Sequence, residues 1–217
     1  MAKDKYYFMK DIKMKVLIFD YDGVLVDSLE TVFKMFNTME KRHERQPVSM
    51  EEYLTFYDNN FWESIKKKGV TQEQIEETFS EVQAYLIAHK DEMPIFPGVV
   101  PVINELTEKF TSFIISSNFT KVVELRLNTM GIKVKDIIGA DKIQSKQKKI
   151  LHIKEQYPDA EIFYIGDTKG DMLEAKEAGV KSVAVTWGYH PKERIKEANP
   201  DFIADTPEEL RKILTEH

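Results

Sequence analysis

Four short apolar or β-branched runs, each followed at once by polar or glycine residues, constrain the fold of this chain more than any other feature. They cover residues 16–19, 113–115, 162–165 and 182–185. Such runs, bounded by turn residues, are typical of strands that are buried on both faces of a parallel sheet. We therefore predict four parallel strands.

Helical patterns lie between the later runs. Apolar residues recur at helical spacing over 123–130, just before Gly131, and over 150–157, just before Pro158. Near the end of the chain, Thr206-Pro207-Glu208-Glu209 has the pattern of a capping box with proline at the first helical position. Alternating strands and helices predict an α/β fold, a Rossmann-like doubly wound parallel sheet with helices on both faces.

Residues 28–92 interrupt this alternation. They contain helical stripes, one of which begins at Leu29, and a capping box at Thr71-Gln72-Glu73-Gln74, but no convincing strand pattern. Pro94 and Pro97-Gly98 mark where the chain returns to the α/β pattern, as a hinge would. We predict an inserted α-helical cap domain over 28–92 and a core domain formed by 1–27 and 93–217. The first 13 residues are an addition without an assigned purpose.

Composition narrows the classes of partner. The 217 residues carry a net charge of −6, which argues against nucleic acid or an anionic membrane as the main partner. The chain has no cysteine, which excludes disulfides and thiolate sites and is in keeping with a cytoplasmic location. No apolar run approaches the length that spans a bilayer, so we expect no membrane insertion. We expect a monomer or a homodimer.

Asp20 and Asp22 lie where the first predicted strand ends and a turn begins. In open α/β sheets, ligands bind at the carboxyl ends of the strands, so this is a suitable place for a site. Two carboxylates so close together would repel each other unless a cation lay between them, and Mg²⁺ prefers such hard oxygen ligands. Gly23 permits a tight turn that would bring backbone N–H groups near a bound anion. An aspartate-rich turn that caps the next helix is the alternative reading.

The segment Asp20-Tyr21-Asp22-Gly23-Val24-Leu25-Val26-Asp27-Ser28 closely resembles the first motif of the haloacid dehalogenase superfamily. The chain is most similar to the branch of phosphoglycolate phosphatases and β-phosphoglucomutase, in which a helical cap is inserted just after this motif. The resemblance covers nearly the whole chain, and its cap position agrees with the helical interruption found independently at 28–92.

The second family motif is a serine or threonine that ends the second core strand and binds the transferring phosphoryl group. Here that strand is followed by Ser116-Ser117-Asn118, with Ser116 as the first candidate and Ser117 as the second. The third motif is a lysine that opens a later helix. Lys146 fits it by its position, although the proline that follows this lysine in many relatives is absent, so that Lys142, Lys148 and Lys149 stay as alternatives.

The fourth motif is matched by Gly166-Asp167-Thr168-Lys169-Gly170-Asp171. The resemblance implies that Mg²⁺ is held by Asp20, by the backbone carbonyl of Asp22, and by Asp167, with Asp171 in support. An N-cap aspartate and a first-turn aspartate would also explain Asp167 and Asp171 without any site.

The resemblance implies a Mg²⁺-dependent phosphatase that acts on a small phosphorylated metabolite, either phosphoglycolate-like or a sugar phosphate. Asp20 would be the nucleophile, Asp22 the general acid and base, and Ser116 and Lys146 would complete the catalytic group. The phosphoryl group would be bound by Gly23, Ser116, Ser117, Asn118 and Lys146.

A β-phosphoglucomutase-like mutase shares all these residues and stays an alternative. Asp22 argues against a dehalogenase, and the intact acidic residues argue against a non-catalytic regulator that binds phosphate or a partner protein. The lysine run at 66–68 is either a grip for an anionic substrate tail or an exposed run, and the role of Trp187-Gly188-Tyr189 is open.

Overall fold

Six parallel strands form one sheet in the computed structural model, which describes residues 14–217. The strands are β1 Lys15–Asp20, β2 Thr111–Ile115, β3 Asp136–Ile138, β4 Glu161–Gly166, β5 Lys181–Val185 and β6 Phe202–Ala204. Their order is β3-β2-β1-β4-β5-β6, so the direction of winding reverses at the centre, between β1 and β4. The predicted α/β doubly wound class is confirmed. The addition predicted over residues 1–13 lies outside the described residues.

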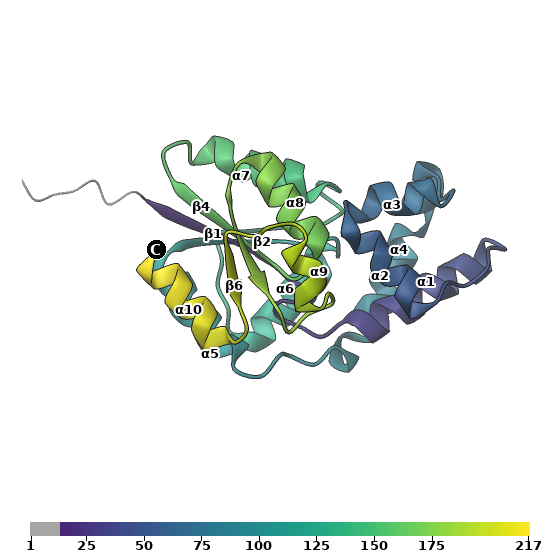
Figure 1. Ribbon diagram of the computed structural model, residues 1–217. Coiled ribbons are helices and arrows are strands. Elements are labelled where there is room, and N and C mark those ends of the chain that lie inside the picture. The colour runs from purple at the N-terminus through teal and green to yellow at the C-terminus, as the bar shows by residue number, and fades with distance from the viewer. Residues whose placement is uncertain (1–13) are drawn as a thin grey trace, which may run out of the picture.

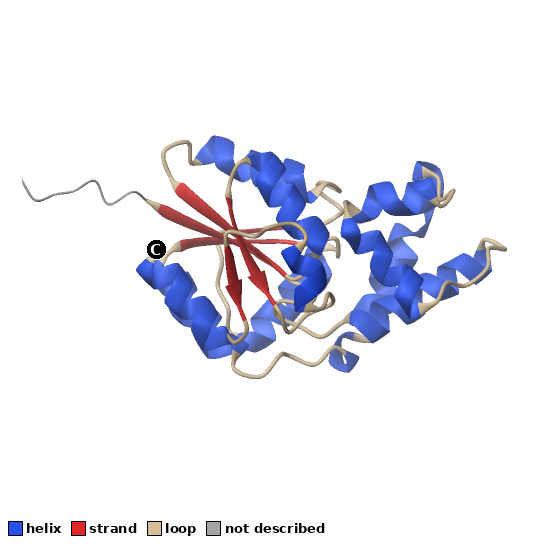
Figure 2. Cartoon of the chain, viewed as in Figure 1, coloured by secondary structure: helices blue, strands red, loops and turns tan. Residues whose placement is uncertain are grey.

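Helices cover both faces of this sheet (Figures 1 and 2). One face packs against α5 Val99–Lys109, α6 Thr120–Met130 and α10 Pro207–Glu216, and the other against α7 Lys146–Gln156 and α8 Lys169–Ala178. The short α9 Lys192–Lys196 lies beside α8. Within β1, Leu17 and Phe19 enter the first of these cores, while Val16 and Ile18 enter the second. Burial on both faces explains why the run is apolar throughout.

The sequence prediction missed the two edge strands. β3 and β6 have only three residues each, too few for a recognisable apolar run. The predicted capping box at the start of α10 is half formed. The Thr206 hydroxyl accepts from the N–H of Glu209 at 3.2 Å, but the Glu209 carboxylate accepts from the N–H of Asp205 at 2.7 Å instead of from Thr206. The capping box at Thr71 is complete.

A group of helices lies beyond the carboxyl end of β1 (Figure 1). It consists of α1 Leu29–Arg42, α2 Met50–Thr55, α3 Phe61–Lys67, α4 Gln72–Ala88 and the short 3-10 turns Phe56–Asp58 and Lys90–Glu92. The two segments that join it to the sheet run side by side. The N–H of Asp27 donates to the carbonyl of Pro94 at 2.8 Å, and the N–H of Phe96 donates to Leu25 at 3.1 Å. This arrangement supports the predicted division into a core and a 28–92 cap, and we keep that division as a proposal.

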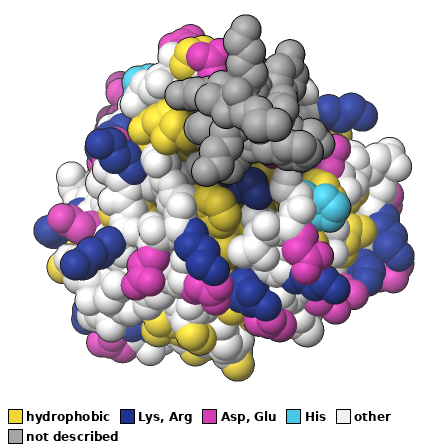
Figure 3. All heavy atoms as spheres, turned by 90° about the vertical axis from the view of Figure 1, so that its left-hand side faces the viewer, with side chains coloured by type: hydrophobic (Ala, Val, Ile, Leu, Met, Phe, Trp, Pro, Cys, Tyr) yellow, Lys and Arg dark blue, Asp and Glu magenta, His cyan; other side chains and the backbone are white. Residues whose placement is uncertain are grey.

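The side of the core that faces away from the cap carries basic and acidic side chains interspersed, outside the area covered by grey atoms (Figure 3). Within residues 14–217, every helix is too short or too polar to cross a membrane.

Candidate active site

The carboxyl ends of β1, β2 and β4 bring three polar side chains to one place at the centre of the sheet. Asp20 is the last residue of β1, Ser116 follows β2, and Asp167 follows β4. All three are buried, with at most 2% of their surface exposed. This is the point where the sheet order reverses, the usual position of a ligand site in such folds.

Lys146 joins two of the acidic residues. It is the first residue of α7, where Ser145 caps the helix, and its Nζ lies 2.5 Å from Oδ2 of Asp20 and 2.6 Å from Oδ1 of Asp171. Among the alternatives, Lys142 and Lys148 are exposed. Lys149 is buried, but its Nζ donates to the carbonyl of Ser116 and not to a carboxylate. The contacts therefore favour Lys146 as the motif lysine.

Asp171 has its hydrogen-bonding capacity filled by the protein. Besides Lys146, it accepts from the Tyr164 hydroxyl at 2.8 Å and from the Thr168 hydroxyl at 2.7 Å and backbone N–H at 3.0 Å. Burial alone would raise the pKa of this carboxyl, but the charge of Lys146 and these hydrogen bonds outweigh burial and lower it. Asp171 therefore holds Lys146 in position through an ion pair.

Asp20 and Asp167 are less well compensated. Burial raises the pKa of Asp20 to about 7 against the effect of Lys146, and burial with the charges of Asp171 and Asp20 raises that of Asp167 well above its usual range. Oδ2 of Asp167 accepts from the N–H of Tyr189 at 2.6 Å, whereas its buried Oδ1 has no hydrogen-bond partner among residues 14–217. Oxygens of Asp20, Asp167 and Asp171 lie within 4.8 Å of one another. Hard oxygen donors with this excess of negative charge fit a divalent cation such as Mg²⁺.

The carboxylate of Asp22 is not part of that acidic cluster and is bonded to hydroxyl groups. Its Oδ1 accepts from the Ser28 hydroxyl at 2.6 Å and its Oδ2 from the Ser116 hydroxyl at 3.0 Å. Burial raises its pKa, against these hydrogen bonds. The side chain of Asp22 is thus separate from the three clustered carboxylates, and the predicted metal contact through its backbone carbonyl stays a prediction.

The residues after β2 surround the same space. The Ser116 hydroxyl also accepts from the N–H of Asn118 at 2.8 Å, and the buried Nδ2 of Asn118 has no partner among the described residues. Ser117 and Asn118 both line the pocket that contains Asp20 and Asp22. The phosphoryl-binding roles predicted for Ser116, Ser117 and Asn118 stay predictions, and an unpartnered amide in this position is in keeping with them.

Gly23 lies in the turn after β1, and its predicted part in binding a phosphoryl group stays a prediction. Its N–H donates to the carbonyl of Val26 at 2.9 Å within this turn. The residue has a φ of +77°, and a Cβ atom at this position would lie 1.8 Å from Oδ2 of Asp167. Gly188 approaches the same oxygen, where a Cβ atom would lie at 2.3 Å. Both glycines make room for Asp167.

Several residues of this site were not predicted from the sequence. Tyr189 donates its N–H to Asp167, and its hydroxyl lies 2.8 Å from that of Ser28. Thr168 and Tyr164 hold Asp171. Trp187-Gly188-Tyr189 therefore borders the site. The position of this segment shortly after β5 could have indicated a site residue, whereas nothing in the sequence distinguishes Tyr164 from an ordinary strand residue.

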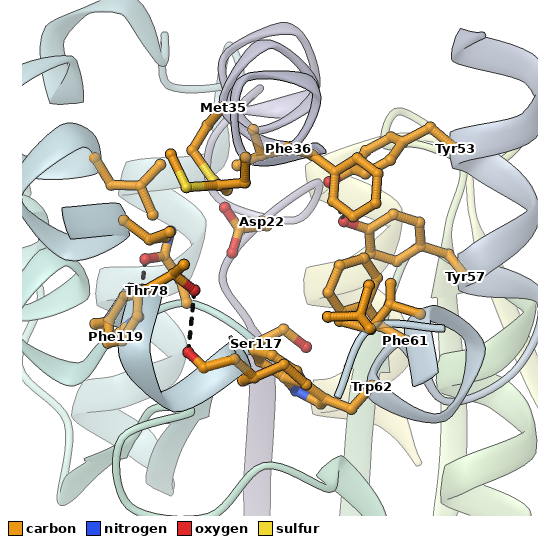
Figure 4. A pocket seen from close by; sticks show the side chains of 18 of the residues that line it. Asp22, Met35, Phe36, Tyr53, Tyr57, Phe61, Trp62, Thr78, Ser117 and Phe119 are labelled. Carbon is orange, nitrogen blue, oxygen red and sulfur yellow. Dashed lines mark hydrogen bonds between the residues drawn. The ribbon is translucent and has the colours of Figure 1, made fainter. Parts of the chain in front are cut away.

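The helical cap contacts the core beside this site. Arg194 forms a two-pronged ion pair with Asp58, with both N···O distances at 2.6 Å, and the buried His190 lies with Nε2 2.9 Å from the carbonyl of Leu54. Figure 4 shows Asp22 facing a space bordered by Tyr57 of the cap and other apolar side chains. The lysines at 66–68 do not line this space; Lys66 and Lys68 pair with Glu63 and Glu52.

Comparison with known proteins agrees with this geometry. The family model described as haloacid dehalogenase-like hydrolase matches residues 17–185. A phosphoglycolate phosphatase of Synechococcus elongatus is 27% identical over 208 residues, which cover 94% of this chain and 98% of the relative. A phosphoglycolate phosphatase of Vibrio parahaemolyticus is 26% identical, and the match covers 93% of this chain and 96% of the relative. The crystal structure of a hydrolase from Pseudomonas syringae shares the fold, with a TM-score of 0.77, 19% identity, and 94% and 99% coverage. These findings confirm the resemblance and the predicted class of enzyme, a phosphatase. The chain belongs to the haloacid dehalogenase-like hydrolase family.

Proposed function

We propose that the chain is a Mg²⁺-dependent phosphatase that hydrolyses the phosphate monoester of a small metabolite through an aspartyl-phosphate on Asp20. The observation that carries this proposal is the position of the Asp20 carboxylate. It lies at the end of the central strand, paired with Lys146, inside a cluster of carboxylates, and on the wall of a pocket that the cap covers. A carboxylate held in this way is a suitable nucleophile for phosphoryl transfer.

The first step joins an oxygen of Asp20 to phosphorus while the bond from phosphorus to the ester oxygen breaks. Asp22 gives its proton to the departing alcohol, and its position in the pocket supports this role, as does the burial that raises its pKa. In the second step a water attacks phosphorus and Asp22 takes its proton. The bond between phosphorus and Asp20 breaks, inorganic phosphate leaves, and the Asp20 carboxylate is restored.

The metal would be held by Asp20 and Asp167, with Asp171 beside them, and it would supply charge that stabilises the transferring phosphoryl group. Lys146, whose Nζ bonds to Asp20, contributes to the same stabilisation. The Ser116 hydroxyl, at 3.0 Å from Oδ2 of Asp22, orients the acid and lies where it can contact a phosphoryl oxygen. The cap excludes bulk water from the reaction.

The direct test measures release of inorganic phosphate from an aryl phosphate. We expect activity with Mg²⁺, its loss after treatment with EDTA, and its return when Mg²⁺ is added. Asp20→Asn should reduce the rate to background while circular dichroism shows an intact fold, whereas the exposed Asp159 offers a matched control, Asp159→Asn, that should keep full activity. Turnover by the metal-stripped enzyme, or by Asp20→Asn, would refute the proposal.

A further inference from the structure

The pocket at the acidic cluster continues into the cap as an apolar space. We call this space the cap chamber and define it by Met35, Phe36, Tyr57, Phe61, Trp62 and Phe79. Together with the site it encloses about 1010 Å³ that no protein atom fills, including its opening to solvent. Figure 4 shows Met35 and the rings of Phe36, Tyr57, Phe61 and Trp62 arranged around the space in front of Asp22. The alcohol part of a substrate bound at Asp20 would extend into this chamber.

The positively charged side chains that line the pocket already form ion pairs with other protein groups. Among the described lining residues, the lysine and arginine side chains are those of Lys146 and Arg45. Lys146 is paired with Asp20 and Asp171, and Arg45 is paired with Glu40 at 2.7 Å and donates to Gln74 at 3.1 Å. A carboxylate or second phosphate on the substrate would therefore be desolvated in the chamber without a free cation, which is costly.

The hydroxyl groups of the chamber are also largely engaged. The hydroxyls of Tyr53 and Tyr57 lie 2.9 Å apart, and that of Thr78 donates to its own helix at Gln74. Two buried nitrogens on the chamber wall, Nε1 of Trp62 and Nε2 of His43, have no partner within residues 14–217. The chamber can thus bind one or two polar atoms, but it lacks partners for the many hydroxyls of a sugar.

We propose that the cap chamber selects a phosphate monoester whose alcohol is uncharged and mainly apolar. This inference rests on the proposed phosphatase function and narrows its substrate class, away from a phosphoglycolate-like or sugar phosphate substrate. The rings of Phe36, Phe61 and Phe79 offer contact to an apolar chain or ring, and removing such a group from water provides the selectivity.

The test uses alkyl phosphates of primary alcohols, from ethyl through butyl to hexyl, because their leaving groups are alike in reactivity and differ in apolar area. We expect kcat/KM to rise about fourfold for each methylene that the chamber buries. Hexyl phosphate has four more methylenes than ethyl phosphate, so full burial of these would raise kcat/KM by about 250-fold, and hexyl phosphate should also exceed 2-phosphoglycolate and a sugar phosphate. If ethyl phosphate is hydrolysed through Asp20 but kcat/KM does not rise with length, the phosphatase proposal stands and the chamber proposal is overturned.

A binding measurement keeps the two proposals separate. Calorimetry with ethylphosphonate and hexylphosphonate in the presence of Mg²⁺ measures the chamber without any turnover. Tighter binding of hexylphosphonate by an inactive protein would support the chamber and refute the phosphatase. Equal affinity for the two would overturn the chamber proposal whatever the activity.

Two cap methionines provide a matched pair of variants. Both are half-buried and pack against the same core, but only Met35 lines the chamber, whereas Met50 does not. Met35→Gln should lower the ratio of hexyl to ethyl kcat/KM several-fold, and Met50→Gln should leave that ratio as it is in the wild type. Equal ratios in the two variants would contradict the proposal.

Discussion

The ammonium nitrogen of Lys146 lies 2.5 Å from Oδ2 of Asp20, so a cation at the start of α7 faces the carboxylate at the end of β1. Both side chains are buried, which makes their interaction stronger than that of a surface pair. Asp171 holds the lysine from its other side at 2.6 Å. The nucleophile that we propose is therefore fixed in position before a substrate arrives.

Asp22→Asn removes the proton donor but keeps the shape of the side chain. We expect kcat/KM with alkyl phosphates, which reports the step in which Asp20 is phosphorylated and the alcohol leaves, to fall by about 10²–10⁴, the usual contribution of a general acid. The loss should be smaller with p-nitrophenyl phosphate, whose leaving group needs little protonation. Steady-state kinetics on both substrates check this, with Asp27→Asn as the control because Asp27 is close in sequence and exposed. An equal loss on both substrates would contradict the acid role.

Gly23→Ala should damage the acidic cluster. The new Cβ atom would lie 1.8 Å from Oδ2 of Asp167, so Asp167 has to move. We expect a loss of activity of at least about a hundredfold and a higher Mg²⁺ concentration for half-maximal rate. Gly131→Ala is a matched control, because Gly131 also has a positive φ but has open space at its Cβ position. It should cost about 1–2 kcal/mol of stability and leave the kinetics intact. If Gly23→Ala has wild-type kinetics, the close contact between Gly23 and Asp167 is not needed for activity.

Lys149→Met should make stability depend less on pH. Burial lowers the pKa of Lys149 to about 7, with Lys146 acting in the same direction and with Asp20, Glu174 and Asp141 opposing it. Between pH 7 and the pKa of a free lysine, the unfolded chain therefore binds a proton that the folded chain does not. The free energy of unfolding therefore rises with pH over this window. Below pH 7 the buried Lys149 is charged in the folded wild type, and this lowers the free energy of unfolding most.

The methionine variant carries no such charge. We take the free energy of unfolding of Lys149→Met minus that of the wild type, measured by urea unfolding at both pH values. This difference should be about 2 kcal/mol larger at pH 6 than at pH 9. Lys148→Met is the control, because Lys148 is exposed on the same helix. If the free energy of unfolding changes between pH 6 and pH 9 by the same amount in Lys149→Met and Lys148→Met, Lys149 is charged in the folded protein at both pH values.

Arg194→Gln should loosen the cap. This arginine bonds Asp58 through two nitrogens, both at 2.6 Å, and links α9 to the cap. The pair is only partly buried, so we expect KM to rise by about two- to tenfold with little change in kcat. Lys192→Gln is a suitable control, because Lys192 pairs with Asp205 within the core. Hydrogen exchange in α2 should be faster in Arg194→Gln alone, and an unchanged rate would show that the ion pair does not hold the cap.

The four longer strands could be predicted because their burial on both sides leaves continuous apolar runs. β3 and β6 could not, since three residues at the edge of a sheet carry too little pattern. Asp20, Asp167 and Asp171 were identified in sequence because their spacing after strands is specific, and the structure brings their oxygens together.

Other features depend on packing that has no sequence signature. Among the four lysines at 142, 146, 148 and 149, the sequence favoured Lys146 by its position before the helix, but only the structure shows that Lys146 reaches Asp20 while Lys149 reaches the carbonyl of Ser116. The same holds for Ser28, whose contact with Asp22 depends on the turn after β1. The cap chamber was not predicted either, because apolar residues on the cap helices read as an ordinary core.

The central claim is that Asp20 carries the phosphoryl group during turnover. The measurement is mass spectrometry of peptides from enzyme that has been mixed with Mg²⁺ and substrate and quenched in acid within the first turnovers. We expect one added phosphoryl group on the peptide that contains Asp20, and no such species in Asp20→Asn. Phosphate release by the wild type with no phosphorylated Asp20, together with continued turnover by Asp20→Asn, would contradict the account.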